Sequence, residues 1–103
     1  MKRYIRSATT TANANAKMIA EAVFGKWYSD DYRVKIFKQV SGYAVKYYAD
    51  GPGYAEDILD QMIEAAKRLN IPVIRSSVKD GWLQQFGSIH YYVACIVVPA
   101  ADV

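Results

Sequence analysis

The sequence predicts a single α+β domain over residues 1–103, with a four- to five-stranded, mostly antiparallel sheet and two helices on one of its faces. Three observations lead to this prediction. A length of 103 residues fits one domain and is enough to bury one core without metals or disulfides. A composition that is 52% hydrophobic, with nearly balanced charge, excludes a disordered chain. Finally, segments with helical periodicity alternate along the chain with segments rich in β-branched and aromatic residues.

The first helix is expected from about Asn13 to Phe24, with Thr11 or Asn13 as its N-cap and Gly25 as its C-terminal stop. The segment is rich in Ala, and its larger apolar residues recur at helical spacing: Met18, Ile19, Ala22 and Val23. The opening residues 1–8 suit either a short edge strand or a basic arm. If residues 3–6 form a strand, the order of elements becomes that of a ferredoxin-like βαββαβ core with an extra C-terminal strand. If they do not, the order is αββαββ.

A β-hairpin is expected from two segments, residues 32–40 and 43–49, which flank Ser41-Gly42. A two-residue turn at Ser41-Gly42 fixes which residues face each other, with Val40 opposite Tyr43 and Phe37 opposite Lys46. One side of this hairpin is mostly apolar and is expected to meet the helices. The other side is basic and aromatic.

The second helix is expected from about Tyr54 to Leu69, after the turn formed by residues 50–53. Its apolar residues form one face: Ile58, Leu59, Met62, Ile63, Ala66 and Leu69. Acidic residues lie near its start and basic residues near its end, as the helix dipole favours. Asn70 and Pro72 are expected to end it.

The last third of the chain predicts two more strands. Residues 72–78 suit a strand, residues 79–81 (Lys-Asp-Gly) suit a turn, and residues 82–87 are ambiguous. Residues 88–98 are apolar on both faces towards their end, so this long strand is placed in the centre of the sheet. The same long strand leaves a homodimer open, through pairing between two chains.

Composition and motifs point away from catalysis. One His and one Cys are too few for a zinc site, and the sequence has no nucleophile motif or phosphate-binding motif, so we expect no metal, no cofactor and no enzyme activity. His90 and Cys95 lie five residues apart on one expected strand, so they point to opposite faces and cannot pair there. No apolar segment is long enough to cross a membrane, and no signal peptide is evident, so we expect a cytoplasmic protein without a membrane partner.

Two surfaces are candidates for binding. The basic and aromatic side of the hairpin would suit DNA or RNA, because cations neutralise phosphates and aromatic rings stack on bases. The candidate nucleic-acid-binding residues are Arg33, Lys35, Phe37, Lys46 and Tyr48, with Lys2, Arg3 and Arg6 as additional cations. A net charge of +3 is compatible with such a partner without requiring one.

The other candidate surface is aromatic. Trp and Tyr dominate the energetics of protein interfaces, and residues 82–86 would present their large side chains together if they formed one helical turn. The candidate protein-binding residues are Trp27, Tyr28, Trp82, Leu83 and Phe86. Because catalytic groups are scarce and aromatic residues abundant, the first expectation is a non-catalytic protein that acts by protein–protein contact. Nucleic-acid binding is the alternative.

The opening Met1-Lys2-Arg3-Tyr4-Ile5-Arg6-Ser7 resembles the start of many small uncharacterised proteins of phages and mobile elements. In size, in lack of catalytic groups and in surplus aromatic residues, the chain is also similar to anti-CRISPR proteins and other phage-encoded inhibitors. This resemblance implies a phage or mobile-element inhibitor or accessory protein that occupies the functional surface of a host protein.

Overall fold

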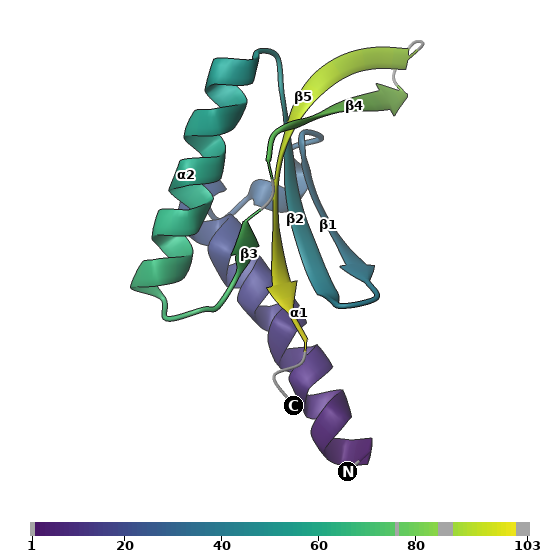
Figure 1. Cartoon of the computed structure of the whole chain (residues 1–103), viewed down its shortest axis with the longest axis vertical. Helices are drawn as coiled ribbons and strands as arrows, with labels where there is room; N and C mark the ends of the chain where they lie inside the picture. Colours follow the sequence, from purple (N-terminus) through teal and green to yellow (C-terminus); the bar gives the residue numbers. More distant parts are fainter. Residues whose placement is uncertain (1, 76, 85–87, 101–103) are drawn as a thin grey trace.

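The computed structural model describes residues 2–75, 77–84 and 88–100 of the chain, with side chains described from residue 11 onward except at 75, 84 and 88. In chain order the elements are helix α1 (Lys2–Phe24), the short 3-10 helix η1 (Tyr28–Asp30), strands β1 (Val34–Gln39) and β2 (Gly42–Ala49), helix α2 (Pro52–Arg68), and strands β3 (Ile74–Arg75), β4 (Lys79–Gln84) and β5 (Ser88–Pro99) (Figure 1).

All strand pairs of the sheet are antiparallel, and β5 lies at its centre. β2 pairs with one edge of β5, while β4 and β3 pair with successive parts of its other edge. β1 pairs with β2 and forms an outer edge of the described sheet. The prediction of an α+β fold with a mostly antiparallel sheet is confirmed, and β5 occupies the central place expected for residues 88–98.

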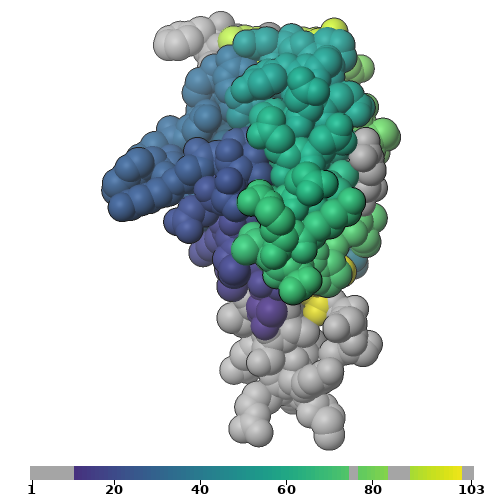
Figure 2. Space-filling model, turned by 90° about the vertical axis from the view of Figure 1, so that its left-hand side faces the viewer, coloured from purple at the N-terminus to yellow at the C-terminus, as the bar shows by residue number. Residues whose placement is uncertain are grey.

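Both helices pack on one face of this sheet and enclose the core. Among the side chains of α1 from residue 11 onward, the buried ones are small except for Ile19, whereas α2 contributes larger ones, among them Leu59 and Met62. The sheet contributes alternate residues of β2 and β5: Val45, Tyr47, Ala49, Ala94, Ile96 and Val98. Figure 2 shows α2, in teal and green, beside the described part of α1, in dark blue. No helix of the described residues covers the opposite face of the sheet, and we call it the open face.

The prediction for the N-terminal segment is wrong. α1 begins at Lys2, so residues 3–6 are helical and the ferredoxin-like alternative is excluded. Thr11 and Asn13 lie inside the helix and are not its N-cap. A helix that is already formed extends at little cost per residue, so the polar residues before Asn13 do not stop it. Gly25 does end α1, with φ +94° and its N–H donating to the Glu21 carbonyl at 2.9 Å.

The two strands of the hairpin are confirmed, but the predicted register is wrong by two residues. Phe37 lies opposite Ala44 and Lys35 opposite Lys46, so the turn is formed by Val40 and Ser41. Gly42 does not belong to the turn but is the first residue of β2. A Cβ atom at this position would lie 2.0 Å from the Val98 carbonyl oxygen, so the close approach of β5 requires glycine here. A slip of two residues preserves the side to which each side chain points.

The second helix is confirmed within a few residues of its predicted ends. Pro52 occupies its first turn, and Asn70, with φ +57°, follows its last turn. Ile58, Leu59, Met62 and Ala66 are buried as predicted, whereas Leu69 is exposed. Leu69 is the C-cap residue, which follows the last helical residue, Arg68.

The expected turn at Lys79-Asp80-Gly81 is wrong, since these residues begin β4. The expected strand over residues 72–78 is reduced to β3, which has two residues. Gly81 fits a strand because a Cβ atom there would lie 2.3 Å from a methyl carbon of Val93. It therefore permits close packing and does not mark a turn. β4 and the adjoining end of β5 bend away from α2 as one arm (Figure 1).

Candidate functional site

The open face brings together the five nucleic-acid-binding candidates of the hairpin. Arg33 is opposite Tyr48 and Lys35 is opposite Lys46, so these side chains share a face with Phe37. The register of β5 and β4 adds residues from distant parts of the sequence to the same face: Lys79, Tyr91, Val93 and Cys95. Lys2, Arg3 and Arg6 belong to α1, and their side chains lie outside the described residues.

Three lysines cross the open face from strand to strand. Lys35 on β1 and Lys46 on β2 are direct cross-strand neighbours. Lys46 is opposite Cys95 on β5, and Lys79 on β4 is opposite Val93, two residues away along the same strand. We call Lys35, Lys46 and Lys79 the lysine row. Within the part of the chain that the structure describes, no carboxylate forms an ion pair with any of them.

Arg33 is held in a structural interaction. Its guanidinium donates two hydrogen bonds to the Asp50 carboxylate, at 3.1 and 3.2 Å, and a third to the Tyr48 carbonyl at 3.0 Å. The hydrogen bonding to Asp50 raises the pKa of Arg33 further above its ordinary value. The guanidinium also lies 5.3 Å from the Tyr91 ring centroid. Since Asp50 compensates its charge, Arg33 adds less to the positive potential than the lysine row does.

The two aromatic candidates of this face differ in accessibility. Phe37 is 38% exposed, and the Lys46 ammonium lies 4.9 Å from its ring centroid. Tyr48 is half-buried, with an edge contact to Tyr91 at 6.1 Å, and burial raises the pKa of its hydroxyl. Phe37 is therefore the ring on this face that a base can reach.

Cys95 lies half-buried between two members of the lysine row. Burial raises the pKa of its thiol, and the positive charges of Lys46 and Lys79 oppose that effect. The strand register places both lysines beside Cys95, since Lys46 is opposite it and Lys79 is opposite Val93, two residues along β5. A thiol with a raised pKa stays protonated near neutral pH, so it is not an activated nucleophile.

The candidate protein-binding residues lie at opposite edges of the sheet. Trp27 and Tyr28 follow α1 near β1, where Trp27 is 70% exposed and Tyr28 is half-buried. Trp82 and Leu83 lie in β4, and Phe86 lies outside the described residues. The possible helical turn starting at Trp82 is excluded, because Trp82, Leu83 and Gln84 lie in β4, and Trp82 and Leu83 therefore point to opposite faces.

Trp82 belongs to an aromatic cluster on the arm. Its ring is 4.8 Å from the His90 ring, which in turn is 4.9 Å from the Tyr92 ring. His90 is bonded through Nε2 to an Asp80 oxygen at 3.0 Å. Asp80, Trp82, His90 and Tyr92 share the side opposite to the open face, so His90 and Cys95 do point to opposite faces as predicted.

Lys79 is the member of the lysine row that sequence reasoning missed. The sequence Lys79-Asp80-Gly81 has the composition of a turn and was therefore predicted as one. These residues instead belong to a strand, in which Lys79, Gly81 and Leu83 point to one face. The local sequence offers no signal that separates this strand from a turn, and its pairing with β5 is what defines it.

Neither helix in the described ranges is long and apolar enough to span a membrane. The described side chains of His, Cys, Asp and Glu form no group of three that could hold a metal ion. Comparison of the chain with protein-family models, with curated proteins and with solved structures finds no match.

Proposed function

We propose that this protein binds single-stranded nucleic acid through the open face of its sheet. The observation that carries the proposal is the lysine row, in which like charges occupy neighbouring strands without carboxylate partners among the described residues. Like charges directly opposite each other destabilise a sheet. The lysine row therefore costs stability in the free protein. A polyanionic ligand would neutralise these charges, and this favours a role of the row in binding.

The dimensions of the row suit a phosphate backbone. Neighbouring strands lie about 4.8 Å apart, so the distance from β1 to β4 across β2 and β5 is about 14 Å. That span covers several consecutive phosphates of one strand. Phe37, beside Lys46, offers a stacking surface at one end of the row. Base stacking on an aromatic side chain contributes about 1–3 kcal/mol per base and tolerates any base.

The experiment is a fluorescence-anisotropy titration of labelled single-stranded DNA, single-stranded RNA and duplex DNA at two salt concentrations. The test variant replaces Lys35, Lys46 and Lys79 with Gln. The control variant replaces three lysines outside the open face with Gln, at Lys17 on α1, Lys38 on β1 and Lys67 on α2. Both variants have the same net charge, so a nonspecific charge effect weakens them equally.

Three phosphate contacts predict a slope of about −2 for the logarithm of the binding constant against the logarithm of salt concentration. The test variant is expected to lose this slope, while the control keeps it. Phe37→Ala is expected to weaken binding by about tenfold without changing the slope. Equal losses in the two lysine variants, or no binding of any nucleic acid at low salt, would contradict the proposal.

Contact with a protein partner is a second candidate function, and one observation favours it. Trp27 and Trp82 are 70% and 62% exposed, although exposed Trp is unusual outside interfaces. A pull-down with Trp27→Ala and Trp82→Ala variants tests it. We expect one partner to bind both the wild type and the lysine-row variant. The same partner should fail to bind a Trp variant that is still folded. Undiminished capture by both Trp variants counts against this function.

A further inference from the structure

The outer edge of β1 has backbone groups without a strand partner in the described sheet. The Tyr48 N–H donates to the Arg33 carbonyl at 2.9 Å, so residue 33 is turned towards β2. Because direction alternates along an antiparallel strand, Lys35, Phe37 and Gln39 are also turned towards β2. Ile36 and Lys38 are turned outward. The outward N–H of Val34 is already used, because it donates to the Asp31 carbonyl at 3.1 Å.

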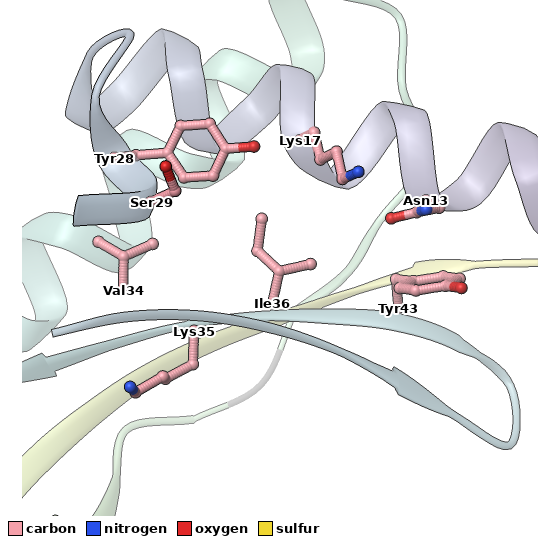
Figure 3. Close-up of a pocket in the computed structure, with 8 residues that line it drawn as sticks. All are labelled: Asn13, Lys17, Tyr28, Ser29, Val34, Lys35, Ile36 and Tyr43. Atoms are coloured by element: carbon pink, nitrogen blue, oxygen red, sulfur yellow. The ribbon is translucent and has the colours of Figure 1, made fainter. Parts of the chain in front are cut away.

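A groove of about 350 Å³ runs beside this edge, between α1 and β1. Figure 3 shows Val34 and Ile36 pointing from β1 into it, with Asn13 and Lys17 on α1 across from them. Tyr28, Ser29, Lys35 and Tyr43 complete the lining. The groove is therefore apolar along the strand and polar along the helix. Lys35 points to the opposite side of β1, towards the open face (Figure 3).

Three lysines lie along this edge, and two acidic residues, Asp30 and Asp31, precede its first residue. Lys35 and Lys38 project from β1 on its two sides, and Lys17 faces the strand from α1. Asp31 accepts a hydrogen bond from the Arg33 N–H at 2.9 Å. A second copy of this edge would bring the same lysines against each other, which disfavours pairing between copies.

We propose that the β1 edge takes up an extended acidic segment of a partner protein as an additional strand. Hydrogen bonds from the outward backbone groups of Ile36 and Lys38 hold the segment. Its apolar side chains enter the groove over Val34 and Ile36, while its acidic side chains, which alternate with them, face Lys35. This edge is separate from the lysine row except at Lys35, so it defines a second binding surface.

Two variants at one position separate backbone pairing from charge. Lys38→Ala removes the charge and keeps the outward N–H. Lys38→Pro removes the N–H as well, at an edge position where Pro does not break the pairing with β2. The probe is a fluorescent capped peptide of alternating Glu and Val, about as long as β1. The control peptide has Lys in place of Glu.

The acidic peptide is expected to bind the wild type, and Lys38→Ala is expected to bind it somewhat less tightly. Lys38→Pro is expected to bind it about fivefold more weakly than Lys38→Ala, the factor that one lost hydrogen bond represents. In wild-type protein, hydrogen exchange at the Ile36 and Lys38 amides is expected to slow when peptide is added. The Lys35 and Phe37 amides, already bonded to β2, are expected to change little.

The amide-exchange pattern keeps the proposal testable if Lys38→Pro fails to fold. Equal affinities of the Pro and Ala variants would overturn it, as would preference for the basic peptide or unchanged exchange at Ile36 and Lys38. Sedimentation that shows dimer formation, with no uptake of peptide, would identify the occupant as a second copy and would equally overturn it.

Discussion

Replacing Lys35 with Gln is expected to make the protein more stable while it weakens nucleic-acid binding. Lys35 is directly opposite Lys46 in a hydrogen-bonded pair of the sheet, where the two backbones lie about 5.5 Å apart. Lys46 has a compensating contact with the Phe37 ring, whereas Lys35 has no ion pair with a described residue. Gln keeps the length and polarity of the side chain and removes its charge.

The size of the gain follows from cross-strand energetics. A pair of neighbouring side chains on a sheet contributes about 0.2–1 kcal/mol, and like charges reverse the sign. Relief of the repulsion should therefore raise the free energy of unfolding by a few tenths of a kcal/mol, and by no more than about 1 kcal/mol. For a domain of this size, that corresponds to a rise in melting temperature of about 1–6 °C.

Urea denaturation, followed by tryptophan fluorescence at low and high ionic strength, measures this effect. The Debye length falls from about 10 Å at 0.1 M salt to about 3 Å at 1 M, so the gain should shrink as salt increases. Lys38→Gln is the matched control, because Lys38 lies on the same strand with Tyr43 opposite it. Two results would refute the reasoning that the lysine row lowers the stability of the fold. One is a lower free energy of unfolding in Lys35→Gln, and the other is an increase that does not depend on salt.

Three further outcomes are expected. Gly42→Ala should destabilise the protein by about 3 kcal/mol in urea denaturation, because a Cβ atom there meets the Val98 carbonyl at 2.0 Å; a change below 1 kcal/mol would show that the strands part easily. Met62→Ala should cost about 2–5 kcal/mol in the same assay, since Met62 is fully buried; a smaller loss would mean that the core collapses into the space. The pH at which the rate of Cys95 alkylation reaches half its limit should be higher in the folded protein than in the urea-unfolded chain, because burial raises the thiol pKa. Lys46→Gln should raise this midpoint pH further, and a midpoint no higher in the folded protein than in the unfolded chain would contradict the burial. Since folding raises the pKa, ionisation of the thiol favours the unfolded chain, and stability should fall as pH rises through this range.

Sequence reasoning succeeded where one local signal agreed with the packing. In α2 the apolar face, the charge distribution and the residues that end the helix all indicate one element, and the structure confirms it. The open face was also predictable in part. Lys35, Phe37 and Lys46 share a side in both the predicted and the observed register, because a slip of two residues leaves every side chain on its original face.

The two wrong turn predictions come from long-range contacts. The position of the hairpin turn is decided by Gly42 against β5, and the strand character of Gly81 is decided by its closeness to Val93. In both cases a residue distant in the sequence fixes the conformation, so the local turn signal is misleading. The groove beside β1 needs α1 and the segment after it to be placed in space, and no spacing in the sequence indicates that placement.

The central position of β5 has a consequence for how the chain acquires its structure. β5 follows all of its sheet partners in the sequence, yet it is the strand to which β2, β3 and β4 are each paired. During synthesis, the hairpin and α2 leave the ribosome before the strand that joins them to the rest of the sheet. Until β5 emerges, the inner edge of β2 is unpaired. The apolar residues of β2 and of the helices then lack the core contacts that β5 supplies. The interval before β5 arrives is therefore when this chain is most exposed to misassociation with other nascent chains.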